Sequence, residues 1–281
     1  MSAEIHIDAL LPAEMARRAE YLGVRKAEAK LIPMFALAVL AGAFIAMGAM
    51  FATTVSAGAS GVLPYGVNRL LVGLVFSLGL ILVVVGGAEL FTGNNLIVMA
   101  WAGGKVSTYA LLRNWVVVYI GNFVGSIGTA ILVFLSKQYM FGSGSVGASM
   151  LSIATSKVHL GFVQALVLGI LCNTLVCLAV WLTYSARSTI DKIMAIVFPI
   201  SAFVAAGFEH SVANMYFIPI GLFIKAFDPA FTVASKVDVT DLTWGNFLIN
   251  NLLPVTIGNI IGGAVLVAAV YWAIFLRKSE G

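Results

Sequence analysis

Charged residues are scarce in this sequence. Only 10% of its 281 residues are Asp, Glu, Lys or Arg, whereas 61% are apolar, and the mean hydropathy is +1.03. A soluble domain has about a quarter charged residues, so a water-soluble fold is excluded. Apolar runs of about 20 residues recur along the chain and predict an all-α integral membrane protein with a single membrane domain and no second, soluble domain.

Cysteine and histidine are also rare. The two cysteines, Cys172 and Cys177, are five residues apart in one apolar run. Residues share a helix face at spacings of three and four, so we expect neither a disulfide nor a metal site. Among the histidines, only His210 lies deep in an apolar run, which leaves too few ligands for haem or a metal, and no cofactor is predicted. The first 30 residues lack the short apolar core of a signal peptide.

Two apolar stretches are too long for one straight helix and too short for two. Residues 66–104 number 39 and residues 191–227 number 37, and 39 helical residues would measure about 58 Å against a hydrocarbon core of about 30 Å. Polar residues interrupt both stretches, so each is predicted to be one broken crossing with irregular backbone inside the protein. The full prediction is a surface helix at 8–23 ended by Gly23, crossings at 31–55, 66–104, 108–135, 159–184, 191–227 and 244–276, and loops at 136–156 and after 227.

The distribution of basic residues predicts the orientation. Six crossings place both termini on one side, and cytoplasmic loops carry an excess of Lys and Arg. The terminal side would hold eleven, namely Arg17, Arg18, Arg25, Lys26, Lys30, Lys105, Arg113, Arg187, Lys192, Arg277 and Lys278, and the other side five, namely Arg69, Lys137, Lys157, Lys225 and Lys236. We therefore expect both termini in the cytoplasm. The net charge of +4 is no nucleic-acid signal, because these residues sit at the ends of apolar runs.

The two broken crossings share a sequence motif. The pattern G-x-E-x4-N begins at Gly87 and again at Gly207, and the pattern N-x6-G-N-x2-G begins at Asn114 and again at Asn251. Each repeat holds three crossings, and because three is odd, the second half enters the membrane from the opposite face. The prediction is therefore two inverted three-helix repeats with the second and fifth helices broken.

Paired broken helices in inverted halves indicate a transport site near the middle of the bilayer. The N-termini of half-helices carry partial positive charge and favour an anion. Asn122 and Asn259, in the second motif, either satisfy backbone groups freed by the breaks or line the path. The glycines of this motif are expected only to permit close helix packing; they are Gly121, Gly125, Gly258 and Gly262.

The predicted organisation has three parts. Residues 1–30 form a cytoplasmic amphipathic segment, residues 31–277 form the transmembrane channel domain with repeats at about 31–136 and 157–277, and residues 278–281 form a cytoplasmic tail. The surface helix in the first part either lies along the membrane interface or acts as a mobile plug or docking segment for a cytoplasmic partner.

Glu209 and His210 stand together inside an apolar run. A charged side chain there is costly, so such a pair is a functional hypothesis by default. The alternative is a structural Glu that holds backbone amides where the helix breaks, and both interpretations can be true together. Only the second half has a histidine at this place, and imidazole titrates near physiological pH, so His210 is the residue predicted to handle a proton.

Five segments carry a family resemblance: Phe-Ser-Leu-Gly-Leu at 76–80, Glu-Leu-Phe-Thr at 89–92, Gly-Phe-Glu-His-Ser at 207–211, Ala-Asn-Met at 213–215 and Pro-Val-Thr-Ile-Gly-Asn at 254–259. They resemble the formate/nitrite transporter family, and its formate-channel branch in particular. The resemblance covers nearly the whole chain. It implies a homopentamer of aquaporin-like protomers, each with its own pore, which passes formate and other small monovalent anions through the bacterial inner membrane.

The resemblance also implies roles for individual residues. Leu80 and Leu90 would form a cytoplasmic constriction, and Phe76 and Phe203 a periplasmic one. The central site would be His210 with Thr92 across from it, supported by the polar residues Glu209, Asn173 and Lys157. The broken second crossing, with Glu89 and Asn94, would be a gating loop in which the N-terminal helix takes part, and Asn214 matches Asn94 in the second half.

The apolar constrictions set the energetics. Removing water from a carboxylate-sized ion costs several kcal/mol even after relaxation. If formate titrates like an Asp side chain, near 3.9, neutralising it at pH 7 costs about 3 pH units, or roughly 4 kcal/mol. We therefore expect Lys157 and the half-helix dipoles to attract the anion, and His210 to give it a hydrogen bond or a proton.

Several alternatives remain open. A nitrite or hydrosulfide transporter of the same family fits the same motifs, and either a passive channel or a proton-coupled transporter is possible. An aquaporin-type channel would use Asn-Pro-Ala motifs at the breaks, which this chain lacks. A membrane hydrolase with Ser211 as nucleophile is disfavoured, because adjacent residues on a helix do not face each other; no enzyme is expected.

Overall fold

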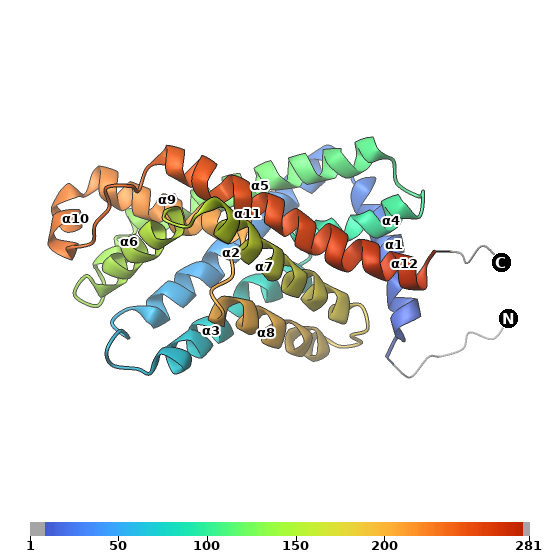
Figure 1. The fold of residues 1–281 in the computed structure, drawn as a ribbon, viewed down its shortest axis with the longest axis horizontal. Coiled ribbons are helices and arrows are strands. Elements are labelled where there is room, and N and C mark those ends of the chain that lie inside the picture. Colours follow the sequence, from blue (N-terminus) through green and yellow to red (C-terminus); the bar gives the residue numbers. More distant parts are fainter. Residues whose placement is uncertain (1–8, 278–281) are drawn as a thin grey trace.

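The computed structural model describes residues 9–277, which contain helices and connecting loops and no strand (Figure 1). Residues 1–8 of the predicted N-terminal segment and the tail at 278–281 lie outside the described residues. The α-helices are α1 (Pro12–Ala27), α2 (Leu31–Ser56), α3 (Tyr65–Gly86), α4 (Val98–Ala102), α5 (Thr108–Leu135), α6 (Ser145–Val158), α7 (Phe162–Thr183), α8 (Thr189–Ala205), α9 (Ser211–Phe227), α10 (Pro229–Ser235), α11 (Leu253–Ile260) and α12 (Val270–Phe275). Short 3-10 turns η1 (Gly93–Ile97) and η2 (Gln138–Met140) and π-helical segments η3 (Asn246–Leu252) and η4 (Ile261–Ala269) complete the chain.

The predicted fold class is confirmed. Five helical segments in the described part of the chain are long and apolar enough to cross a bilayer: α2, α3, α5, α7 and the continuous helix from Asn246 to Phe275. The remaining crossing, the fifth along the chain, is made by α8 and α9, 17 residues each, which are separated by the Glu209–His210 break. The second crossing, α3, likewise breaks before it continues into η1 and α4.

The two halves are inverted with respect to each other. Helices α1, α4 and α12 gather at one end of the molecule, and α6 and α10 gather at the other (Figure 1). The helical segments that follow the two breaks run toward opposite ends, since η1 and α4 contact α1 whereas α9 contacts α6 and α10. We call these ends the α1 end and the α10 end.

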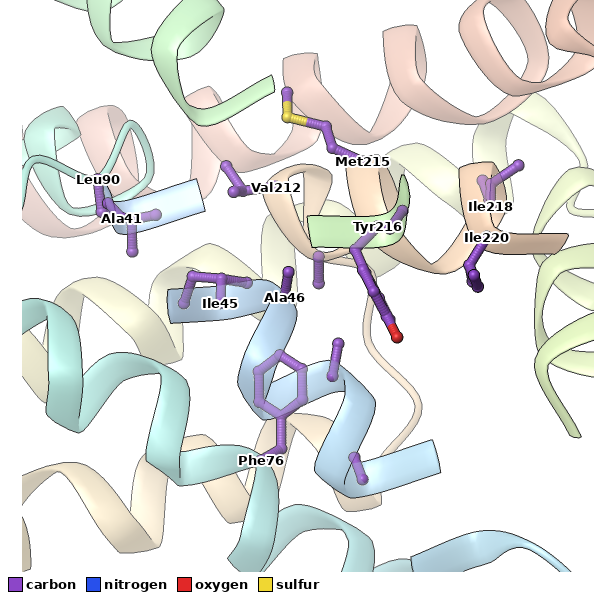
Figure 2. Packing of buried hydrophobic residues seen from close by; sticks show 14 of the residues in the cluster. Ala41, Ile45, Ala46, Phe76, Leu90, Val212, Met215, Tyr216, Ile218 and Ile220 are labelled. Atoms are coloured by element: carbon purple, nitrogen blue, oxygen red, sulfur yellow. The ribbon is translucent and has the colours of Figure 1, made fainter. Parts of the chain in front are cut away.

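The core joins the two halves. Figure 2 shows buried side chains of α2, α3 and the first break facing those of α9. Small residues line α2, because lipid provides no hydrophobic drive for helix association and close packing must replace it. The labelled residues are Ala41, Ile45, Ala46, Phe76 and Leu90 from the first half, and Val212, Met215, Tyr216, Ile218 and Ile220 from the second.

The predicted end of the surface helix is wrong. Helix α1 continues through Gly23 to Ala27. A Cβ at Gly23 would lie 3.1 Å from the Ala100 side chain and 3.4 Å from the backbone of Ile97. The glycine therefore serves close packing of α1 on η1 and α4, and it is not a helix stop.

The predicted loop at 136–156 is also wrong, since most of it is helical. Glycine and serine residues occupy a short turn, and α6 begins at Ser145. Met150, Ala154 and Val158 recur at a spacing of four and are buried, in a helix that packs on α9. The segment after residue 227 is likewise not all loop: α10 begins there, and the Asp228 side chain accepts a hydrogen bond from the Phe231 amide at 3.0 Å.

The motif glycines pack helices closely, as the sequence predicts. A Cβ added at Gly125 would collide with the carbonyl of Val39 and lie 2.9 Å from the amide nitrogen of Ala43. Gly258 and Gly262 meet the backbone of α7 in the same way. In both halves the first crossing therefore touches the third backbone to backbone.

Replacing Gly125 with alanine is expected to destabilise the protein by about 1–3 kcal/mol, because overpacking forces the helices apart. The measurement is the thermal unfolding midpoint of the purified protein. Gly128 lies on the same helix with nothing within 4 Å of its Cβ position, so Gly128→Ala is the matched control and should not lower the midpoint. A Gly125→Ala midpoint equal to that of the parent contradicts the close-packing role.

Candidate functional site

Each broken crossing turns at a glycine with a left-handed backbone. Gly87 has φ 80° and Gly207 has φ 77°, a conformation that glycine adopts without strain. In both halves the amide of the next residue donates to the carbonyl five residues earlier, at 2.9 and 3.0 Å. The two turns have the same geometry, and each leads directly to a glutamate.

The glutamate of the second break is held by three side chains. Lys157 Nζ lies 2.7 Å from Glu209 Oε1. The amide nitrogens of Asn214 and Asn251 donate to Glu209 Oε2 at 2.7 and 3.3 Å. Glu209 is only 4% exposed, so these bonds replace the water that a buried carboxylate needs.

The first break repeats this arrangement. Lys26 Nζ lies 2.8 Å from Glu89 Oε1, and Asn94 Nδ2 donates to Glu89 Oε2 at 2.7 Å. The Asn94 amide also donates to Asn114 Oδ1 at 2.9 Å, just as Asn214 donates to Asn251 at 2.7 Å. Lys26 was not among the predicted site residues.

Helices α1 and α6 are equivalent elements of the two halves. Each carries, near its C-terminus, the lysine that bonds the glutamate of its own half. Each also packs on the helical segment that follows the break, α1 on η1 and α4 and α6 on α9. In each half the glutamate amide donates to a leucine carbonyl, Leu37 at 3.2 Å and Leu168 at 3.3 Å. Lys26 precedes Leu37 by eleven residues and Lys157 precedes Leu168 by the same number. This shared spacing is the signal that could have found Lys26.

Asn122 and Asn259 hold the broken backbone. The side-chain oxygen of each accepts a hydrogen bond from the backbone amide two residues after the glutamate. Phe91 donates to Asn122 and Ser211 donates to Asn259, both at 2.9 Å. Each side-chain amide donates to the carbonyl of its own half's glutamate, at 2.9 and 3.0 Å, and to a carbonyl of a neighbouring helix. Of the two roles open for these residues, the structure assigns backbone support, because both amide hydrogens are used and both residues are fully buried.

Asn173 supports the first break from α7. Its Nδ2 lies 2.9 Å from Asn95 Oδ1, 3.3 Å from the Thr92 carbonyl and 2.6 Å from the Asn259 carbonyl. Asn173 therefore links the two breaks; within residues 9–277 it makes no hydrogen bond to the His210 ring or the Glu209 carboxylate.

The two breaks meet at His210 and Thr92. Thr92 Oγ1 lies 3.1 Å from His210 Nε2, and the Ala213 amide donates to His210 Nδ1 at 3.1 Å, which makes His210 the N-cap of α9. Because Nδ1 accepts a hydrogen bond, the proton of a neutral ring is on Nε2. The ring therefore presents an N–H donor to Thr92, while its face stacks on Phe203 with centroids 6.0 Å apart.

Two cavities are lined by residues of the breaks. The first, of about 540 Å³, is lined by Lys26, Glu89, Leu80 and Leu90 among others, and we call it the Lys26 cavity. The second, of about 330 Å³, is lined by Lys157, Glu209, His210, Phe76 and Phe203 among others, and we call it the Lys157 cavity. Leu80 and Leu90 are buried, and the rings of Phe76 and Phe203 meet edge to face at 5.7 Å. The residues predicted to form the constrictions thus line the two cavities, Leu80 and Leu90 the first and Phe76 and Phe203 the second.

Arg69 closes the end of α8 beside the Lys157 cavity. Its guanidinium donates to the carbonyls of Val204 and Ala205, the latter at 3.1 Å. These carbonyls lie at the negative end of the helix dipole, and that of Val204 also accepts from the Gly207 amide at 3.1 Å. Arg69 therefore fixes the C-terminal end of α8, next to Phe203.

Arg69→Gln is expected to lower stability by about 1–2 kcal/mol, since hydrogen bonds from a charged donor contribute about 1.5–3 kcal/mol and this site is partly exposed. The thermal midpoint should fall, and hydrogen exchange at residues 204–208 should rise. Lys192→Gln, at the opposite end of α8, is the control and should leave both unchanged. Unaltered exchange in Arg69→Gln contradicts the capping role.

Two inverted repeats, whose broken helices meet at a buried polar contact between two cavities, define a membrane channel or transporter for a small solute. The family described as "Formate/nitrite transporter" matches residues 13–273. This chain belongs to the formate/nitrite transporter family.

Relatives match over nearly full length. The formate channel FocA of Escherichia coli (strain K12) is 47% identical over 284 residues, which cover 100% of this chain and 99% of that protein. FocA of Haemophilus influenzae is 43% identical and covers 92% of each chain. A solved structure described as a pentameric formate channel with formate bound superposes with a TM-score of 0.82 and 47% identity, covering 88% of this chain and 98% of that one.

Proposed function

We propose that this chain is a formate channel of the bacterial inner membrane. It passes formate and other small monovalent anions in both directions, as a homopentamer with one pore in each protomer. The observation that carries the proposal is the Thr92–His210 contact at the junction of the two breaks, with a lysine-bearing cavity on either side. The similarity to formate channels, one of them solved as a pentamer with formate bound, supports the ligand and the assembly.

The proposed path follows the order of the lining residues. An anion enters at the Lys26 cavity, crosses Leu80 and Leu90, meets Thr92 and His210, crosses Phe76 and Phe203, and leaves through the Lys157 cavity. The α1 end is the cytoplasmic end in this proposal, which the excess of basic residues there supports. Residues 31–277 form the channel domain.

The two lysines draw anions into the cavities. Each is held by a glutamate, at 2.8 and 2.7 Å, so its ammonium group is fixed at the inner wall. The side chain of Lys26 is 31% exposed and that of Lys157 is 14% exposed, which leaves donors free for a passing ion. A fixed cation beside an apolar constriction offsets part of the cost of removing water from the anion.

His210 acts as a hydrogen-bond donor to the anion. Its Nε2–H points to Thr92, and a carboxylate can take the place of the threonine oxygen. A ring protonated on both nitrogens would lose the bond from the Ala213 amide, because Nδ1 would no longer accept. This geometry supports a neutral ring that lends a hydrogen bond, in preference to a ring that gives up a second proton.

Gating is proposed at the first break. Glu89 and Asn94 tie the loop to Lys26 of α1, so a shift of α1 would move Leu90. Asn214 is the matching residue of the second break, where α6 replaces α1. We propose that pH acts through α1, and that α1 is also the docking segment for any cytoplasmic partner.

The enzyme alternative has no support in the geometry. Both nitrogens of His210 are bonded to groups other than Ser211, so His210 is not placed to activate that hydroxyl. We propose a non-enzymatic role, consistent with relatives that are described as channels and transporters.

The proposal is tested by flux into proteoliposomes. Formate, nitrite, hydrosulfide and water are each measured at two pH values. Formate flux well above that of empty liposomes, with little water flux, is the expected result. Nitrite or hydrosulfide flux that exceeds formate flux overturns the assignment of the substrate but keeps the channel.

A further inference from the structure

The Lys26 cavity holds more positive charge than its carboxylate balances. Four basic side chains line it: Arg18, Arg25, Lys26 and Lys192. Among residues 9–277, Glu89 is the one acidic residue in its wall, and Glu89 is already bonded to Lys26 and Asn94. Within the same range, no carboxylate lies in salt-bridge distance of the three other cations.

The Lys157 cavity has no such excess. Its lysine is paired with Glu209 at 2.7 Å, and its arginine, Arg69, donates to the backbone carbonyls at the end of α8. The two cavities are related by the inverted repeat, yet within residues 9–277 only the Lys26 cavity is lined by cations without a carboxylate or carbonyl partner. One of these cations, Arg25, lies over the exposed Tyr21 ring, 6.0 Å from its centroid. The asymmetry therefore does not follow from the conduction path that both halves share.

The three cations other than Lys26 reach the cavity from two different helices. Arg18, Leu22 and Arg25 recur at spacings of four and three, which places them on one stripe of α1. Lys192 comes from the first turn of α8, on a different wall. Leu80 and Leu90 belong to the same cavity, so a ligand held by these cations lies directly over the predicted constriction.

We propose that the Lys26 cavity binds a small polyvalent anion that bears a diphosphate group, and that the bound anion closes the pore from the α1 end. A monovalent ion neutralises one cation, whereas a diphosphate pairs with several at once. Guanidinium groups match phosphate oxygens bidentately, and a volume of about 540 Å³ is that of a small-molecule site. By bridging α1 and α8, the anion would also hold α1 over the opening of the Lys26 cavity.

Binding is tested first, on the purified full-length protein in lipid nanodiscs. Inorganic pyrophosphate and ADP are titrated separately by calorimetry, which distinguishes a free diphosphate from a nucleotide as the source. The triple variant Arg18→Gln/Arg25→Gln/Lys192→Gln is expected to bind at least tenfold more weakly. Arg17→Gln is the matched control, because Arg17 is exposed on the same helix but does not line the cavity. Absence of binding, or equal binding by the parent and the triple variant, overturns the site.

Closure is tested by flux and rests on the proposed function. Pyrophosphate on the α1 side of oriented proteoliposomes should reduce formate flux through the parent protein several-fold. It should not change formate flux through the triple variant. The same concentration on the α10 side should have no effect. Binding without a change in flux overturns closure. If the parent passes no formate at all, the proposed function fails, and the calorimetric comparison still decides the site.

Discussion

Replacing His210 with phenylalanine is expected to slow formate passage by about 10- to 100-fold at neutral pH. The phenyl ring can still stack on Phe203, but it offers no N–H to the anion at the meeting point of the two breaks. A hydrogen bond to a charged group contributes about 1.5–3 kcal/mol, and 1.36 kcal/mol corresponds to a factor of ten. The measurement is formate flux into proteoliposomes at two pH values.

A second variant separates loss of the donor from loss of the fold. His210 also caps α9 through the Ala213 amide at 3.1 Å. Asparagine is a favoured N-cap and carries an amide donor without a titratable group, so His210→Asn should keep the thermal midpoint and retain more flux than His210→Phe. A His210→Phe protein with the rate of the parent would sink the proposed role.

Replacing Lys157 with methionine is expected to destabilise the protein by about 3 kcal/mol, the loss typical when one partner of a buried ion pair is removed. Glu209 is almost fully buried and would keep only its two asparagine donors. The thermal midpoint of the purified protein should fall. Formate flux should also fall, because the Lys157 cavity would lose its cation.

The inverted repeat supplies the matched control. Lys26→Met removes the equivalent lysine from Glu89, but that pair is more exposed, at 31% and 13% for the two side chains against 14% and 5%. Its effect on stability should therefore be smaller, about 1 kcal/mol. The double variant Lys157→Met/Glu209→Gln should recover part of the loss, since no uncompensated charge is left buried. Equal midpoints for Lys157→Met and the parent contradict the argument.

The two breaks could be predicted from their motifs because those motifs specify short-range backbone geometry. A glycine followed by Glu and Asn at fixed spacing describes one turn, and the same turn forms twice with φ near 80°. The lengths of the two long apolar stretches, compared with the bilayer, required a break in each. These inferences need only neighbouring residues and the thickness of the membrane.

Errors arose where composition misled about packing. Glycine and serine at 136–156 suggested a loop, yet the buried stripe of Met150, Ala154 and Val158 makes most of the segment a helix against α9. Gly23 suggested a helix stop, yet it lies inside α1 because Ile97 and Ala100 approach too closely for a side chain. In both cases tertiary contact overrides local propensity.

Hydropathy, length and spacing are properties of the chain alone, and they predict the membrane class, the six crossings, the two breaks and their inverted repetition. Only the tertiary structure decided that Lys26 and Lys157 are equivalent, that Asn122 and Asn259 hold backbone, and that Nδ1 of His210 accepts from an amide. Such partners lie 31 to 90 residues apart or depend on the orientation of a ring. A buried charge or amide is satisfied by whichever group folding brings to it, and spacing along the chain does not name that group.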